Sequence, residues 1–251
     1  MRKAMITVAA ALLFGSAGQA LAAGIELPKQ DWSFEGIFGT YDRASAQRGL
    51  QVYQEVCAGC HSLKFIYYRN LADIGYSAAA IKAFAAENEI EDGPNGEGEM
   101  FMRPARPSDR FVRPFPNDNA ARAGNNGAFP PDLSLMVEAR VGGPNYLHAL
   151  LTGYVDPPSD MTVMEGMNYN KYFTGNQIAM PPPLSDDAVE YADGTKATVD
   201  QMSRDVVMFL AWTSEPNMEE RKSMGMKVML FLFVFTGLLI AVKRRVWADV
   251  H

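Results

Sequence analysis

The sequence predicts a mainly α-helical domain with long irregular loops, followed by one C-terminal transmembrane helix. Apolar residues recur at helical spacing in several short stretches, whereas no stretch alternates convincingly between apolar and polar residues as a half-buried strand does. Two stretches rich in glycine, proline and asparagine, residues 87–127 and 156–183, interrupt the helical patterns and indicate loops. An apolar block near the C-terminus supplies the transmembrane helix.

The expected helices of the domain cover residues 46–58, 133–141, 145–151 and a stretch that begins after Thr198. Ser45 is a suitable N-cap for the first helix, and Thr198 is a suitable N-cap for the last one. Pro216 marks the break before the apolar block, because proline lacks the N–H group that a helix interior requires. A small helical core with long loops is typical of a domain organised around a large cofactor.

The N-terminus has the three parts of a secretory signal peptide. Arg2 and Lys3 precede the apolar residues 4–14, and small residues follow up to Ala22. The apolar run is too short to cross a hydrocarbon layer about 30 Å thick. A mitochondrial presequence would be amphipathic and richer in arginine. We therefore predict a signal peptide over residues 1–22 of a bacterial exported protein.

The C-terminal block, residues 224–242, contains Lys227 as its one charged residue and is just long enough to span a bilayer. A buried helix of a water-soluble domain, the alternative, would show polar residues at helical spacing. Basic residues 243–245 follow at once, which places this end in the cytoplasm by the positive-inside rule. We predict an anchor over residues 223–243, a cytoplasmic tail over 244–251 and a periplasmic domain over 23–222, at the bacterial inner membrane.

The exported domain is strongly acidic. Removing Arg2 and Lys3 changes the formal net charge from −6 to −8, and removing the anchor and tail, which together carry +3, leaves about −11 on the domain. This charge disfavours nucleic acid as a partner and suits a basic protein. Plain solubility explains the acidic balance equally well.

Residues 57–61 read Cys-Ala-Gly-Cys-His, the signature of covalent c-type haem attachment. Two thiols at this spacing reach the two vinyl groups on one porphyrin edge, and the imidazole of His61 then lies beneath the iron. Thioether bonds to Cys57 and Cys60 use both cysteines of the chain. A zinc site would need further ligands that two cysteines and three histidines do not readily supply, and a thioredoxin-like redox pair would need a βαβ context that is absent from the pattern.

The sixth iron ligand decides what such a haem does, because a methionine thioether closes the iron and raises its potential for electron transfer. Met180 is the best candidate, since three prolines follow it and stiffen its loop. The alternatives are Met161, Met164 and Met167 in a looser loop, and His148, which is more simply explained as a packed core histidine.

Five segments together resemble the cytochrome c1 family, bacterial type, which provides the c-haem subunits of quinol:cytochrome c oxidoreductases, the cytochrome bc1 complexes. They are residues 57–61, 121–134, 142–154 and 178–184, and the C-terminal anchor with the Lys-Arg-Arg-Val-Trp sequence after it. The resemblance covers nearly the whole chain after the signal peptide.

Site residues follow from this resemblance position by position. Met180 matches the family's axial methionine, and Arg140 matches an arginine that pairs with a haem propionate. Asn125 and Pro131 match residues that line the haem pocket, and Tyr146 matches a tyrosine beside the haem.

The resemblance implies one covalent haem c with His/Met ligation and no catalytic residue in the chain itself. Its partners would be cytochrome b and the Rieske iron–sulfur protein within a dimeric complex, with a soluble or membrane-tethered c-type cytochrome as electron acceptor. Three other functions stay open at this point: a membrane-anchored c-type subunit of a terminal oxidase or independent electron donor, a peroxidase with an open iron, and a structural anchor whose haem is redox-silent.

Overall fold

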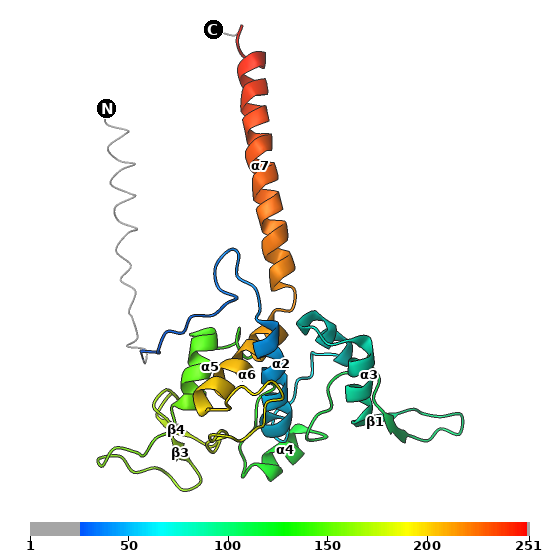
Figure 1. Ribbon diagram of the computed structural model, residues 1–251, viewed down its shortest axis with the longest axis vertical. Helices are drawn as coiled ribbons and strands as arrows, with labels where there is room; N and C mark the ends of the chain where they lie inside the picture. Colours follow the sequence, from blue (N-terminus) through cyan, green and yellow to red (C-terminus); the bar gives the residue numbers. More distant parts are fainter. Residues whose placement is uncertain (1–25, 250–251) are drawn as a thin grey trace.

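The computed structural model describes residues 26–249, and the predicted signal peptide therefore lies outside the described residues. A small helical body carries one long helix that projects from it (Figure 1). The elements are, in chain order, α2 (Arg43–Val52) with a π-helical extension η1 (Tyr53–Cys57), the 3-10 helix η2 (Tyr68–Ile74), α3 (Ala78–Ala86), β1 (Glu89–Asp92), β2 (Phe101–Pro104), α4 (Asp118–Gly124), α5 (Gly143–Thr152), β3 (Asn168–Tyr169), β4 (Gln177–Ile178), α6 (Val199–Ser214) and α7 (Met218–Val246). The mainly α fold with long loops is confirmed.

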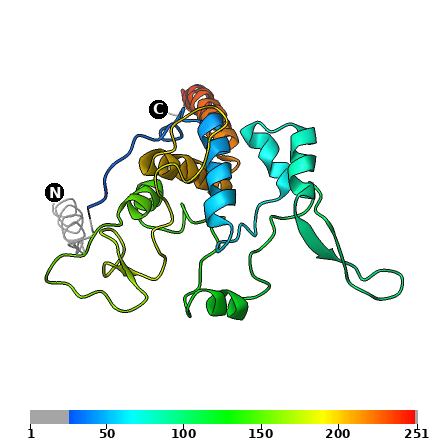
Figure 2. The ribbon, with the colours of Figure 1, turned by 60° about the horizontal axis from the view of Figure 1, so that its bottom comes forward.

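Helices α2 and α6 form the centre of the core, and α5 packs on α6 (Figures 1 and 2). Four side chains at this contact are almost completely buried: Leu50 on α2, Tyr53 at the start of η1, and Val206 and Phe209 on α6. Burying side chains of this size stabilises each by about 1.5–3 kcal/mol relative to leaving it in water. The α2–α6 pair is therefore a rigid support for η1 and the cysteine motif, which follow the C-terminal end of α2.

Helix α2 begins earlier than Ser45 predicts. Asp42 is its N-cap and accepts a hydrogen bond from the backbone N–H of Ser45 at 3.1 Å. The Ser45 hydroxyl instead donates to the buried carboxylate of Asp205 on α6, at 2.7 Å. The expected cap is wrong because a partner 160 residues away competes for the same side chain.

The predicted helix over residues 133–141 is also wrong, since these residues form turns. The helix expected at 145–151 is present as α5, which begins slightly earlier. Both predicted loop stretches hold short regular elements: an antiparallel β1–β2 hairpin and α4 in the first, and the β3–β4 hairpin in the second. Each strand has four residues or fewer, which is too short to show a clear alternation of apolar and polar residues in the sequence.

The last two helices follow the prediction. Thr198 caps α6 and accepts from the backbone N–H of Gln201 at 3.2 Å, and Pro216 lies in the break between α6 and α7. With 29 residues, α7 is about 43 Å long and encloses the predicted anchor. Within residues 26–249, it is the one helix long and apolar enough to cross a membrane. Its apolar stretch is not buried against the domain.

The segment before α2 ties the start of the chain to the base of α7. The backbone N–H of Tyr41 donates to Glu219 at 2.8 Å, and its hydroxyl donates to the carbonyl oxygens of Ala211 and Glu215 at 3.2 and 3.0 Å. Arg43 pairs with Glu219 at 2.5 Å. The segment before α2 and the base of α7 therefore meet on one side of the body.

Candidate haem-binding site

The cysteine motif lies at the end of α2, which points away from α7 toward α4 and the β3–β4 hairpin (Figure 1). The π-helical residues of η1 end at Cys57, after which the backbone N–H groups of Cys60 and His61 both donate to the Cys57 carbonyl oxygen, at 3.1 and 2.9 Å. This tight turn brings the two cysteines and the histidine together. Both thiols are free, Cys57 being half-buried and Cys60 exposed. Burial raises the pKa of the Cys57 thiol to about 12, the opposite of the lowered pKa that marks a redox-active pair.

The imidazole of His61 is oriented by one hydrogen bond. Its Nδ1 lies 2.8 Å from the carbonyl oxygen of Pro131, and a carbonyl can only accept, so Nδ1 carries the proton. Nε2 then keeps its lone pair for a metal. Burial lowers the pKa of His61, outweighing the opposite effects of the Pro131 hydrogen bond and the Asp132 charge, so that the ring is neutral at neutral pH as a ligand must be.

The loop that carries Pro131 is fixed by the carboxylate of Asp132, a residue that the sequence analysis missed. Asp132 accepts from the Ser62 hydroxyl at 2.7 Å and from the backbone N–H groups of Lys64 and Ser134 at 2.8 and 3.0 Å. Burial alone would raise the pKa of Asp132, but these hydrogen bonds hold it below its usual value. The Asp-Leu-Ser sequence is a recognisable Asx turn, which was the one local signal available.

Met180 follows β4 and is half-buried. Its carbonyl oxygen accepts from the Tyr154 hydroxyl at 3.1 Å and from the Asn168 side chain at 3.4 Å, so the backbone is held before the three prolines begin. Of the alternatives in the looser loop, Met164 is 61 % exposed. No sequence signal linked Tyr154 to Met180, because the bond joins separate loops.

Two of the remaining predicted residues lie near each other. Burial raises the pKa of Tyr146, in the first turns of α5, and the nearby Arg140 guanidinium partly opposes that rise. Arg140 is exposed and donates to the Ala139 carbonyl oxygen at 3.3 Å. Asn125 lies elsewhere, at the C-cap of α4, where its side chain donates to the Ala121 carbonyl oxygen at 2.7 Å.

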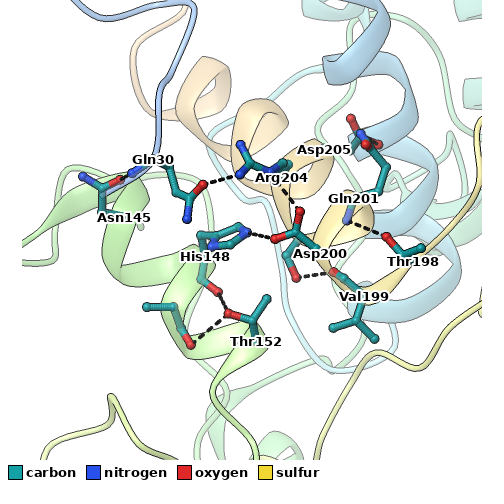
Figure 3. Close-up of polar contacts among 12 residues, drawn as sticks. Gln30, Asn145, His148, Thr152, Thr198, Val199, Asp200, Gln201, Arg204 and Asp205 are labelled. Carbon is teal, nitrogen blue, oxygen red and sulfur yellow. Dashed lines mark hydrogen bonds and ion pairs between the residues drawn. The ribbon is translucent and has the colours of Figure 1, made fainter. Parts of the chain in front are cut away.

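His148 is a packed core histidine, as its apolar neighbours in the sequence indicate. Its Nε2 lies 3.0 Å from the Asp200 carboxylate, which also accepts from Arg204 on the next turn of α6 (Figure 3). The ring is buried and meets the edge of Trp32. A histidine held in this way is not presented to an external iron.

The donors present fit a c-type haem. Two unpaired thiols lie on one turn, and the adjacent imidazole is fixed with Nε2 unprotonated, the arrangement that covalent attachment and axial ligation require. Among residues 26–249, no three His, Cys, Asp or Glu side chains gather in a way that could hold a metal ion by themselves, so the zinc alternative has no support there.

Comparison with known proteins decides the family. The model of the Cytochrome C1 family matches residues 32–250. This chain belongs to the Cytochrome C1 family. Cytochrome c1 of Rhodospirillum rubrum is 47 % identical over 100 % of this chain and 98 % of its own length, which supports a bacterial member of the family.

Two further relatives extend the comparison. A mitochondrial relative from Arabidopsis thaliana, named cytochrome c1 1, heme protein, is 55 % identical over 88 % of this chain and 72 % of its own. A Bradyrhizobium diazoefficiens protein named cytochrome b/c1 is 48 % identical over 98 % of this chain but only 39 % of its own length. Membership of the family makes this chain a c-type haem protein and agrees with its C-terminal apolar helix.

Proposed function

We propose that this chain is the electron-transfer subunit of a cytochrome bc1 complex, taking one electron from a Rieske iron–sulfur protein and delivering it to a c-type cytochrome. The observation that carries the proposal is the His61–Pro131 hydrogen bond beside a Cys-x-x-Cys-His turn, in a chain of the Cytochrome C1 family. The relative named cytochrome b/c1, much longer than this chain, supports cytochrome b as a partner. On its own, the chain carries electrons and has no catalytic residue.

The proposed ligands divide into covalent and axial ones. Cys57 and Cys60 would form thioethers with a single haem, and His61 Nε2 and the Met180 thioether would be the two ligands of its iron. The bound haem supplies a one-electron iron couple whose potential the methionine raises. The chain's part is to hold the His61 ring through Pro131 and to hold the Met180 backbone through Tyr154 and Asn168.

The other predicted pocket residues have supporting roles in the proposal. The exposed guanidinium of Arg140 is free to pair with a haem propionate by a charge-assisted hydrogen bond. Tyr146 near it, Asn125 at the C-cap of α4 and Pro131 beside His61 would line the pocket.

We propose that the domain, residues 23–222, lies on the periplasmic side of a bacterial inner membrane after removal of residues 1–22. Lys243, Arg244 and Arg245 in the last turn of α7 support a cytoplasmic C-terminus by the positive-inside rule. The anchor, residues 223–243, packs against cytochrome b or lipid in a dimeric complex, and residues 244–251 form the cytoplasmic tail.

The acceptor is proposed to be a basic c-type cytochrome, soluble or tethered. The net charge of about −11 on the domain provides a field that speeds the approach of such a partner in a salt-sensitive way.

Mild-detergent extraction of the native membrane tests the function. A b-type cytochrome and a Rieske protein should co-purify with the chain, and a quinol should reduce its haem through them. Recovery with a copper–haem oxidase instead would support the terminal-oxidase alternative. Ready binding of carbon monoxide by the ferrous chain at neutral pH would show an open iron and favour the peroxidase alternative.

A further inference from the structure

A short turn over residues 33–40 is held rigidly at its base. The backbone N–H of Thr40 donates to the Ser33 carbonyl oxygen at 3.0 Å, and the Ser33 hydroxyl donates to the Thr40 carbonyl oxygen at 2.8 Å. The preceding Trp32 is buried and stacks on Phe34, with ring centroids 5.7 Å apart. The turn is therefore a fixed projection of the body.

Lys222 on α7 clamps this turn to the base of the long helix. Its Nζ donates to the carbonyl oxygens of Phe34 and Gly39, at 2.5 and 3.1 Å, on either side of the tip. The same views that show α7 leaving the body show the dark blue segment before α2 rising beside the first turns of α7 (Figures 1 and 2).

The tip of the turn presents two apolar side chains to solvent. Ile37 is 63 % exposed and Phe38 is 82 % exposed, although Trp32 and Tyr41 on either side of the turn are buried. A rigid turn that exposes adjacent aliphatic and aromatic side chains indicates a partner for them. We name these two residues the Ile37–Phe38 tip.

The height of the tip along α7 indicates which partner it is. The apolar residues 224–242 measure about 28 Å along the helix axis, which matches a hydrocarbon core of about 30 Å. Hydrocarbon therefore begins near Met224, and Lys222 lies about 3 Å before it, at the level of the lipid headgroups. Lys222 Nζ holds Phe34 and Gly39, the residues that flank the tip, so the turn meets α7 at that level.

We infer that the Ile37–Phe38 tip inserts into the headgroup–acyl boundary of the bilayer, beside the point where α7 enters it. Lipid is the occupant because two side chains are too few for a protein interface, which covers about 800 Å² on each partner. Aromatic and aliphatic side chains at this depth are typical of interfacial anchoring. A second membrane contact next to the helix would restrict rocking of the domain about its single anchor. The inference rests on the proposal that α7 spans the bilayer.

Site-directed spin labelling of the haem-loaded full-length chain in its native complex tests the inference. Phe38→Cys supplies one reactive thiol, since Cys57 and Cys60 are consumed by haem attachment, and the haem absorbance spectrum reports that the domain is folded. Gly96→Cys, in the exposed β1–β2 hairpin, is the water control, and Phe233→Cys, on the exposed surface of α7, is the hydrocarbon control. The measured quantity is the ratio of collision rates with oxygen and with a water-soluble nickel complex.

The ratio at position 38 should exceed that at position 96 by several-fold and approach that at position 233. A ratio equal to that at position 96 would place the tip in water and overturn the inference. Low collision rates with both reagents at position 38 would show that protein covers the tip, which also overturns it. A water-like ratio at position 233 would instead disprove the anchor itself, and the inference with it.

Discussion

Gly49 of α2 lies directly against the backbone of Asp205 on α6. A Cβ atom added to Gly49 would come 2.7 Å from the Cβ of Phe209 and closer still to the Asp205 carbonyl group. The two central helices can approach this closely only because position 49 has no side chain. The cysteine motif begins two helical turns later, so this approach sets where the motif sits relative to the rest of the core.

Gly49→Ala should force α2 and α6 apart and lower the free energy of unfolding by about 1–3 kcal/mol, the usual cost of overpacking a core. Gly225→Ala on α7 is the helical control, because open space surrounds its added methyl group. Denaturant titration of both variants, followed by haem absorbance, measures the difference. An unchanged midpoint for Gly49→Ala would contradict the close approach.

Asp205→Ala should be more damaging still. The carboxylate is fully buried and accepts from Arg48 Nε at 2.9 Å and Nη2 at 3.0 Å, as well as from Ser45. Removing it leaves a largely buried guanidinium without its main partner, which costs about 3–5 kcal/mol. Asp193→Ala removes the second, exposed partner of Arg48 and should change the thermal midpoint much less. Equal effects of the two substitutions would count against a buried pair that joins the helices.

Asp132→Ala should loosen the loop that holds the Pro131 carbonyl oxygen against His61. Three donors lose a charged acceptor, and each such hydrogen bond is worth about 1.5–3 kcal/mol. For this variant we expect a lower free energy of unfolding, a broadened haem absorbance spectrum and a shifted reduction potential. Asp160→Ala, in an exposed turn, is the control and should change none of these. A destabilised variant with an unaltered spectrum and potential would show that Asp132 supports the loop without orienting His61.

Met180→Leu should open the sixth coordination position. Leucine has a similar volume but no sulfur, so the reduction potential should fall by part of the roughly 0.8 V range that axial ligands span, and the ferrous protein should bind carbon monoxide. Met164→Leu, in the looser loop, should leave both properties unchanged. If Met164→Leu produced the carbon monoxide complex and Met180→Leu did not, the ligand assignment would be reversed.

His148 should make the fold less stable in mild acid. Burial lowers the pKa of His148 below its usual 6.5, and Arg204 adds to this, while Asp200 only partly opposes it. The unfolded chain therefore binds the proton more readily, and stability that is complete above pH 6.5 is lost as pH falls through the folded-state pKa. His148→Gln should reduce this loss. Free energies of unfolding at pH 7.5 and 5.5 measure this loss for both proteins, which differ only at position 148. Parallel slopes would refute the role of His148.

Local signals in the sequence predicted the features that depend on neighbouring residues. The Thr198 cap, the break at Pro216 and the Cys-x-x-Cys-His turn all depend on contacts within a few residues of one another. Ser45 failed as a cap because Asp205, far along the chain, takes its hydroxyl, and Asp42 is left to cap α2.

The loop around residue 132 shows why the rest could not be predicted. Leu133 and its apolar neighbours have helical spacing, but the backbone N–H of Leu133 donates to the Ser62 carbonyl oxygen at 2.9 Å. Bonds to the cysteine segment thus replace the helical ones and produce turns. The orientation of His61 by Pro131, and the anchoring of Met180 by Tyr154, likewise join residues whose pairing no local pattern encodes.

The late position of α6 in the chain has a consequence for how the protein is made. Helix α2 cannot bury its apolar face until α6 exists, and α6 ends roughly 150 residues after Cys57. Cofactor attachment therefore has a time window in which both thiols belong to an open chain, and the final packing of α6 and of the segment around Tyr41 closes that window.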